Sequence, residues 1–239
     1  MPQEDEAISV NNEHLTATVS YNNSQAGLVV VEGWGTKNAL TTVPSISIQN
    51  SSLNSSVFSI VGALYLESGL KLDVAGENPT DGNVLIESFT GTSNYDIGAV
   101  AIYGGWLAAP GEEKTGTRLR ASNLTIRTIT GNNNAAGKSI SGIHMMSGGE
   151  VDIAGKTEIT AVTGNFDAYG IQMEGHNRYL RPTVFQTSQL AISDITANNG
   201  KALASVFPMA QLISLAGMTP SSVISPQRMV WRLVSKPKL

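Results

Sequence analysis

The chain has 239 residues, 14% of them charged, and a formal net charge of −4 at pH 7. This weak charge, without any cluster of five or more Lys and Arg residues, argues against electrostatic binding of nucleic acid. The sequence contains no cysteine and no run of 18 apolar residues, which excludes a disulfide scaffold and predicts that no transmembrane helix is present.

The first residues are polar and acidic. Residues 1–14 are predicted to form a polar lead-in, and they lack the apolar core of a signal peptide. Residues 15–21 alternate between apolar and polar side chains, a pattern typical of a half-buried β-strand. The chain is therefore interpreted either as a cytosolic protein or as an internal piece of a longer exported protein.

From residue 27 onward the sequence repeats itself. Short apolar runs bounded by glycines start at Gly27, Gly62, Gly98, Gly142 and Gly170. A second phrase, at residues 126–132, returns at residues 159–165 and 192–198, each time 33 residues later. A third phrase, at residues 72–76, is echoed at residues 151–155. Repeats of about 20–50 residues are typical of solenoids and propellers.

The three phrases keep one order, so each unit is predicted to hold about three short strands. Helical repeats such as tetratricopeptide and ankyrin are disfavoured, and a propeller blade would need about 40–50 residues and four strands. We therefore predict an all-β domain over residues 15–200. Its predicted fold is a single-stranded right-handed parallel β-helix of about five to six coils, with about 4.8 Å between equivalent strands of successive coils.

Equivalent positions of successive coils should stack into columns. The first predicted inward column consists of Leu28, Ala63, Ala99, Ile143 and Ile171, and the second of Val30, Tyr65, Ala101, Met145 and Met173. The outward column between them consists of Val29, Leu64, Val100, His144 and Gln172. The early coils are then apolar on both faces, which indicates either a covered outer face or an alignment error of one residue.

The 33-residue phrase predicts two more columns. Ile126, Ile159 and Ile192 should form an inward column, and Asn132, Asn165 and Asn198 a ladder of stacked amides.

Two longer stretches interrupt the repeat, at residues 106–117 and 175–187. Such insertions collect on faces or edges of solenoids and often carry binding. The second insertion carries the polar and aromatic side chains His176, Arg178, Tyr179 and Arg181.

Residues 201–239 differ in composition from the repeat. No Asp or Glu follows Asp194, whereas the segment contains Lys201, Arg228, Arg232, Lys236 and Lys238. The prolines at positions 208, 220 and 226 would interrupt any long element. We predict an irregular C-terminal segment, which is either a cap over the last coil or a truncated end.

The phrases GIHMMSGGEVDIAG and ITAVTGN resemble the passenger regions of bacterial autotransporters and related pectate-lyase-like β-helix adhesins. The likeness covers residues 15–200 and rests on repeat texture, low charge and the absence of cysteine. It implies a fragment of a surface-exposed or secreted passenger that engages host molecules or glycans without catalysis. It also implies that the signal peptide and the membrane β-barrel of the family lie outside this chain.

Several residues could carry chemistry. The carboxylates of Glu32, Glu67 and Glu174 beside the glycine turns could serve glycoside hydrolysis, although solvated carboxylates are the expectation. Asp73 and Asp152 recur in matching strands, but about two coils apart they would be roughly 10 Å from each other, too far to share a calcium ion. No metal and no cofactor are expected.

A binding site is predicted around the second insertion. His144 on the outward strand face could approach Glu174 and the insertion. The predicted binding residues are therefore His144, Glu174, His176, Arg178, Tyr179 and Arg181. Trp34 and Trp106 could stack on sugar rings or pack over the early coils. A polysaccharide lyase or glycoside hydrolase on the same fold, or a structural spacer, are the alternative functions.

Overall fold

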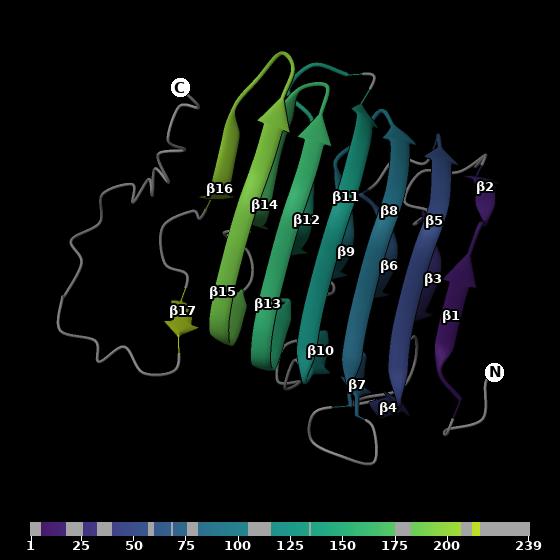
Figure 1. Ribbon diagram of the computed structural model, residues 1–239, viewed down its shortest axis with the longest axis vertical. Helices are drawn as coiled ribbons and strands as arrows, with labels where there is room; N and C mark the ends of the chain where they lie inside the picture. The colour runs from purple at the N-terminus through teal and green to yellow at the C-terminus, as the bar shows by residue number, and fades with distance from the viewer. Residues whose placement is uncertain are drawn as a thin grey trace, which may run out of the picture.

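The computed structural model describes residues 6–17, 26–32, 40–56, 60–67, 69–75, 81–104, 116–133, 135–174, 183–206 and 212–215. Every regular element in these ranges is a β-strand, and all strand pairs are parallel. The strands stack as a β-solenoid, which confirms the predicted fold class (Figure 1). The solenoid has about four turns, slightly fewer than the five to six expected.

One side of the solenoid is a six-stranded sheet in the order β16-β14-β12-β9-β6-β3. Its strands are β3 (Ala26–Glu32), β6 (Val61–Glu67), β9 (Ile97–Tyr103), β12 (Ser139–Met146), β14 (Asp167–Glu174) and β16 (Ala202–Val206).

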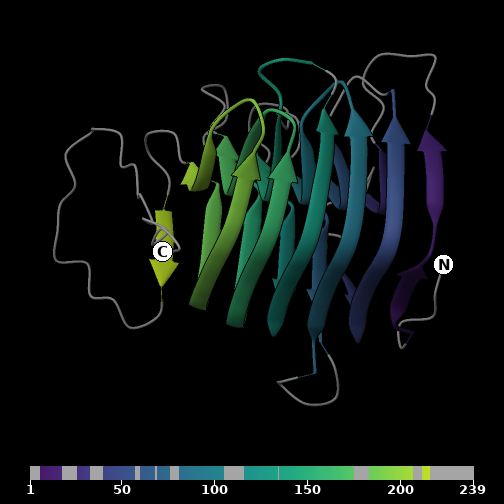
Figure 2. The same cartoon turned by 45° about the horizontal axis from the view of Figure 1, so that its top comes forward.

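The other strands form an eleven-stranded sheet. They are β1 (Ile8–Asn11), β2 (His14–Ala17), β4 (Leu40–Val43), β5 (Ser45–Ser55), β7 (Lys71–Val74), β8 (Asn83–Ser93), β10 (Arg118–Ala121), β11 (Asn123–Asn133), β13 (Glu150–Gly164), β15 (Val184–Ala197) and β17 (Leu212–Leu215). The first part of β13 pairs with β10 and its second part with β11, so the sheet bends around a corner and each coil has three strand segments. The long strands lie side by side in front of the six-stranded sheet (Figures 1 and 2).

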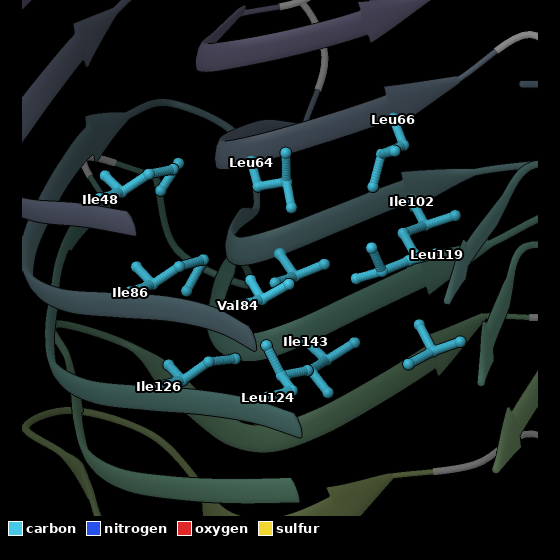
Figure 3. Packing of buried hydrophobic residues seen from close by; sticks show 14 of the residues in the cluster. Ile48, Leu64, Leu66, Val84, Ile86, Ile102, Leu119, Leu124, Ile126 and Ile143 are labelled. Atoms are coloured by element: carbon cyan, nitrogen blue, oxygen red, sulfur yellow. The ribbon is translucent and has the colours of Figure 1, made fainter. Parts of the chain in front are cut away.

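The predicted isoleucine column is confirmed. Ile126 pairs in register with Ile159, and Ile159 with Ile192. The side chains of Ile126 and Ile159 are completely buried, while Ile192 in the last long strand is partly buried against the same core. Ile86 and Ile48 continue the column toward the N-terminus (Figure 3). A 33-residue spacing in the sequence therefore corresponds to one turn of the solenoid at this position.

The columns predicted for the six-stranded sheet are wrong by one residue between β9 and β12. Gly98 pairs with Ser141, not with Gly142, and Val100 pairs with Ile143. Leu64 and Val100 consequently point into the core, whereas Tyr65 and Ala101 belong to a separate cluster on the outer face.

The error arises because these strands do not alternate strictly. Ala63 and Leu64 are consecutive, yet both pack in the core, and the strand pairing skips Ala63. In β12 the equivalent of Ala63 is Gly142, whose added Cβ would lie 2.6 Å from Ile159. The glycine that begins the apolar run therefore occupies the inward position in β12, as Gly142. In β6 and β9 the corresponding glycine, Gly62 or Gly98, lies one position earlier.

The glycine of the Thr-Gly-Asn phrase makes room for a core side chain. A Cβ added to Gly131 would lie 2.5 Å from Cδ1 and 2.7 Å from Cβ of Ile140, and one added to Gly164 would lie 2.7 Å from the same residue. Gly91 has the same relation to Ile97. These glycines lie within or at the end of strands and have no positive φ, so packing explains them and the predicted turn does not.

The Asn positions of that phrase do share one register, as predicted. Their backbone N–H groups continue the ladder, because Asn165 donates to the carbonyl of Gly131 and Asn198 to that of Gly164. The side-chain amide of Asn132 donates to Thr92 Oγ1 at 3.5 Å. The register of the ladder is confirmed, while the amide of Asn132 bonds to a threonine of the preceding coil.

A column of left-handed residues bends the long strands at one level. Positive φ values of 48° to 57° occur at Asn12, Asn50, Ser88, Thr128, Ala161 and Asp194. The residues just before them are in register from coil to coil. Each strand pairing skips the left-handed residue, so the outer face of the long strands is divided into two halves. The repeat phrases gave no indication of this bend.

Thr128 is the most strained member of this column, since a β-branched residue at φ 55° is an outlier. Thr128 is exposed, so its replacement removes little packing. Thr128→Asn should raise the free energy of unfolding by about 1 kcal/mol, because Asn tolerates the left-handed region. Urea unfolding would measure the change, with Thr125→Asn on regular backbone of the same strand as the control. Equal effects at the two positions would contradict the strain.

The solenoid extends past the predicted limits at both ends. β1 and β2 pair with β5, so strands begin within the predicted lead-in of residues 1–14. β16 pairs with β14 and β17 with β15, so strands also occur beyond residue 200. Residues 207–211 and 216–239 lie outside the described residues, and the choice between a cap and a truncated end stays a prediction.

Candidate functional site

The outer face of the six-stranded sheet brings two predicted site residues together. His144 on β12 pairs in register with Gln172 on β14, and Met146 with Glu174. His144 Nε2 lies 3.1 Å from Glu174 Oε1, and Gln172 Nε2 donates to the same oxygen at 2.8 Å. An ionised carboxylate only accepts hydrogen bonds, so Nε2 of His144 is the protonated nitrogen.

The hydrogen bonds continue from β14 through β12 to Asp96, the residue before β9. Ser139 Oγ lies 2.7 Å from Gln172 Oε1 and 3.0 Å from Asp96 Oδ1, so its single proton can serve only one of these acceptors. The Ser139 N–H donates to Asp96 Oδ1 at 2.8 Å, and Lys138 Nζ lies 3.3 Å from Asp96 Oδ2. The cluster therefore connects two carboxylates, one at each end.

The two partners of the His–Glu pair differ in exposure. The side chain of His144 is 1% exposed and that of Glu174 is 42% exposed. The hydrogen bond from His144 lowers the pKa of Glu174, although partial burial opposes the shift. His144 Nδ1 is buried as well, without a hydrogen-bond partner. A general base must come within hydrogen-bond reach of its substrate, and this imidazole is closed off from solvent, so the pair is better suited to orienting Glu174.

The lowered pKa of Glu174 has a consequence for acid stability. The pKa of Glu174 is lower in the folded chain than its ordinary value of 4.5, so the ionised carboxylate stabilises the fold at pH values above 4.5. This contribution is lost as the pH falls through the folded-state pKa. Glu174→Gln should therefore destabilise the protein at pH 6 more than at pH 3. Urea unfolding of both proteins across this range measures the difference, and a constant difference would contradict the pairing.

The other predicted carboxylates do not converge with Glu174. Glu67 is 1% exposed and accepts a hydrogen bond of 3.1 Å from Tyr65, so the expectation of a solvated carboxylate is wrong. The backbone of Glu32 is in register with Glu67. Three strand spacings separate β6 from β14, or roughly 14 Å. Glycosidase carboxyl pairs are about 5–9.5 Å apart.

Asp73 and Asp152 are bound by arginines. Arg120 pairs in register with Asp73 on one side and with Asp152 on the other, and so lies between them. Arg118 is 3.1 Å from Asp73, and Arg120 Nε is 3.7 Å from Asp152. An arginine between the two carboxylates occupies the space in which a shared cation would have to sit.

Several predicted residues lie outside the described residues. These are His176, Arg178, Tyr179 and Arg181 of the second insertion, together with Trp34 and Trp106. Within the described ranges, no group of three or more His, Cys, Asp or Glu side chains could hold a metal ion. The described part of the chain likewise has no helix long and apolar enough to cross a membrane.

The eleven-stranded sheet carries a surface that the sequence analysis missed. Beyond the left-handed bend, its outward positions form two rows that cross the coils. The first row consists of His14, Ser52, Thr90, Thr130, Thr163 and Thr196. The second row consists of Thr16, Asn54, Thr92, Asn132, Asn165 and Asn198. We call these two rows the Thr/Asn face.

The Thr/Asn face contains no carboxylate, lysine or arginine. Its side chains on β8, β11 and β13 are partly buried, and those on β2 and β15 are exposed. On β5, Ser52 is partly buried and Asn54 is exposed. The other half of the outer face, before the bend, does carry charges, including the ion pair of Arg127 and Glu158 at 2.9 Å. The Thr-Gly-Asn phrase indicates both rows, because its threonine lies in the first row and its asparagine in the second. Only the asparagine was predicted to form a column.

Comparison with known proteins gave no match. No family model, no curated protein and no solved structure matches the chain.

Proposed function

We propose that this chain is part of a surface-exposed or secreted bacterial passenger of the autotransporter kind, which binds host molecules or glycans without catalysis. The supporting features are a rigid parallel β-solenoid, low charge and no cysteine. A chain without cysteine can cross membranes unfolded without forming wrong disulfides.

The observation that carries this proposal is the state of the candidate catalytic groups. His144 is buried and bonded to Glu174, Glu67 is buried against Tyr65, and the two strand aspartates are bound by arginines. An acid–base pair for glycoside hydrolysis needs two carboxyl groups facing one substrate bond. These four groups instead face protein partners, which leaves the outer faces of the sheets as the surfaces that a partner can reach.

A carbohydrate-active enzyme is the second candidate, and one observation favours it. Glu174 is partly exposed and held in the ionised form beside a histidine. A partly exposed carboxylate of this kind could act as a base or nucleophile if its second partner came from residues 175–182, outside the described residues.

We expect the purified chain to show no turnover of pectin, xylan, cellulose or heparin, measured as new reducing ends and as unsaturated products. The reason is that Asp96, the other carboxyl group of the cluster, is hydrogen-bonded to Ser139 and lies 3.3 Å from Lys138 Nζ, while His144 beside Glu174 is buried. Glu174→Gln serves as the matched variant. Turnover by the parent chain that disappears in this variant would refute the non-catalytic function and favour the enzyme.

Surface exposure has its own test. In intact cells that produce the protein, added protease should cleave it while cytosolic marker proteins stay whole. Protection of the chain until the cells are lysed would contradict a surface or secreted location.

A further inference from the structure

We propose that the Thr/Asn face binds an uncharged polysaccharide that lies across the coils. This inference rests on the proposed function and names its binding surface and ligand class. Three properties of the face support it: its periodicity, its lack of charge and the packing of its side chains.

The face is periodic in two directions. Neighbouring members of a row are one strand spacing apart, about 4.8 Å, and the two rows are two residues apart along each strand, about 6.6 Å. Six strands contribute one member each to a row, so a row extends over roughly 24 Å. A ligand that contacts every strand in the same way must itself repeat along its length. Polysaccharides repeat in this manner, whereas the surfaces of most folded proteins do not.

The chemistry of the face matches sugar hydroxyls. Threonine and serine hydroxyls and asparagine amides both donate and accept hydrogen bonds, as sugar hydroxyl groups do. An acidic polysaccharide would require lysine or arginine to pair with its charges, and neither occurs in the two rows. His14, at one end of the first row, is the one titratable side chain of the face. The composition of the two rows therefore favours a neutral polymer over a sulfated or uronic one.

The central side chains are also held in place. Thr90, Thr130 and Thr163 are partly buried between their neighbours along the row, and the amide of Asn132 donates to Thr92 Oγ1 at 3.5 Å. Side chains ordered before binding lose less conformational entropy when a ligand arrives. Many weak contacts in register can then add up along the polymer.

The test compares lysine substitutions within and outside the face. Thr130→Lys and Thr163→Lys place a bulky cation in the first row, where no carboxylate is present to pair with it. Thr125→Lys is the control, because Thr125 lies on β11 like Thr130, is partly buried and faces outward on the other side of the bend, in register with Glu158. Circular dichroism and thermal melting would establish that all three variants fold.

The probes are insoluble cellulose, insoluble β-1,3-glucan and amylose as neutral polymers, with heparin and polygalacturonate as charged ones. We expect the parent chain to bind at least one neutral polymer, and each row variant to bind it about tenfold more weakly. Thr125→Lys should stay within about twofold of the parent.

Three results would overturn the inference: no binding to any neutral polymer, binding to the charged polymers alone, or equal weakening by Thr125→Lys and Thr163→Lys. None of them affects the non-catalytic function or the surface location, because those depend on turnover and protease access. Turnover that requires Glu174, in contrast, would refute the proposed function while leaving the row variants able to report binding.

Discussion

Replacing Ile159 with alanine should lower the free energy of unfolding by about 2–4 kcal/mol. Ile159 is completely buried, between Ile126 of the preceding coil and Ile192 of the following one. Its side chain also fills the space over Gly142, where an added Cβ would lie 2.6 Å from it. Truncation would leave a cavity with neighbours on every side, and strands paired on both edges cannot move inward to close it.

The matched control is Ile192→Ala in the same column. Ile192 is only partly buried because it lies in the last long strand, so less apolar surface is lost and solvent can reach the site. We expect its cost to be about half that of Ile159→Ala. Urea unfolding followed by circular dichroism would measure both. An equal cost at the two positions would contradict the conclusion that side chains in the last coil are less deeply buried than those in the interior.

Gly131→Ala should destabilise the protein by about 1–3 kcal/mol. The added methyl group would lie 2.5 Å from Cδ1 and 2.7 Å from Cβ of Ile140. The second of these atoms is next to the backbone and cannot move away by a change of rotamer. Ile140 would have to shift, and it is completely buried in the same core.

A double-mutant cycle would identify the cause. Ile140→Ala alone should cost about 2–5 kcal/mol. In the double variant the methyl group added at position 131 no longer meets Cδ1 of residue 140, although the contact with its Cβ remains. The cost of the double variant should therefore be smaller than the two single costs added together. The control is Gly137→Ala, where no atom lies within 4 Å but φ is +78°, so its cost comes from backbone strain and should not depend on Ile140. Additive costs for Gly131→Ala and Ile140→Ala would contradict direct packing between them.

The architecture could be predicted because repetition in the sequence reflects repetition in space. Equal spacing of Ile126, Ile159 and Ile192 means equal length of chain per turn. In a parallel solenoid, equal length per turn stacks equal residues. The low charge and the turn-forming residues supported an all-β chain, and the interior of the long strands followed from simple alternation.

Alternation failed in the six-stranded sheet. There, Ala63 and Leu64 both face the core, and no pattern of period two can describe two inward residues in a row. The column of left-handed residues could not be predicted either, because Thr and Ala do not favour positive φ by themselves. The strand pairing on both sides holds them in this conformation.

The candidate site depended still more on tertiary structure. His144 and Glu174 were each identified from the sequence, but their contact follows from the register of β12 against β14. The placement of Arg120 between Asp73 and Asp152 likewise arises from the stacking of three coils.

The sequence alone determined the length of chain per turn, and through it the solenoid and its isoleucine column. Only the tertiary structure decided which side chains face each other across the coils. Contacts between coils join residues about 30–45 positions apart, and an offset of one residue in one strand moves a side chain from the core to the outer face.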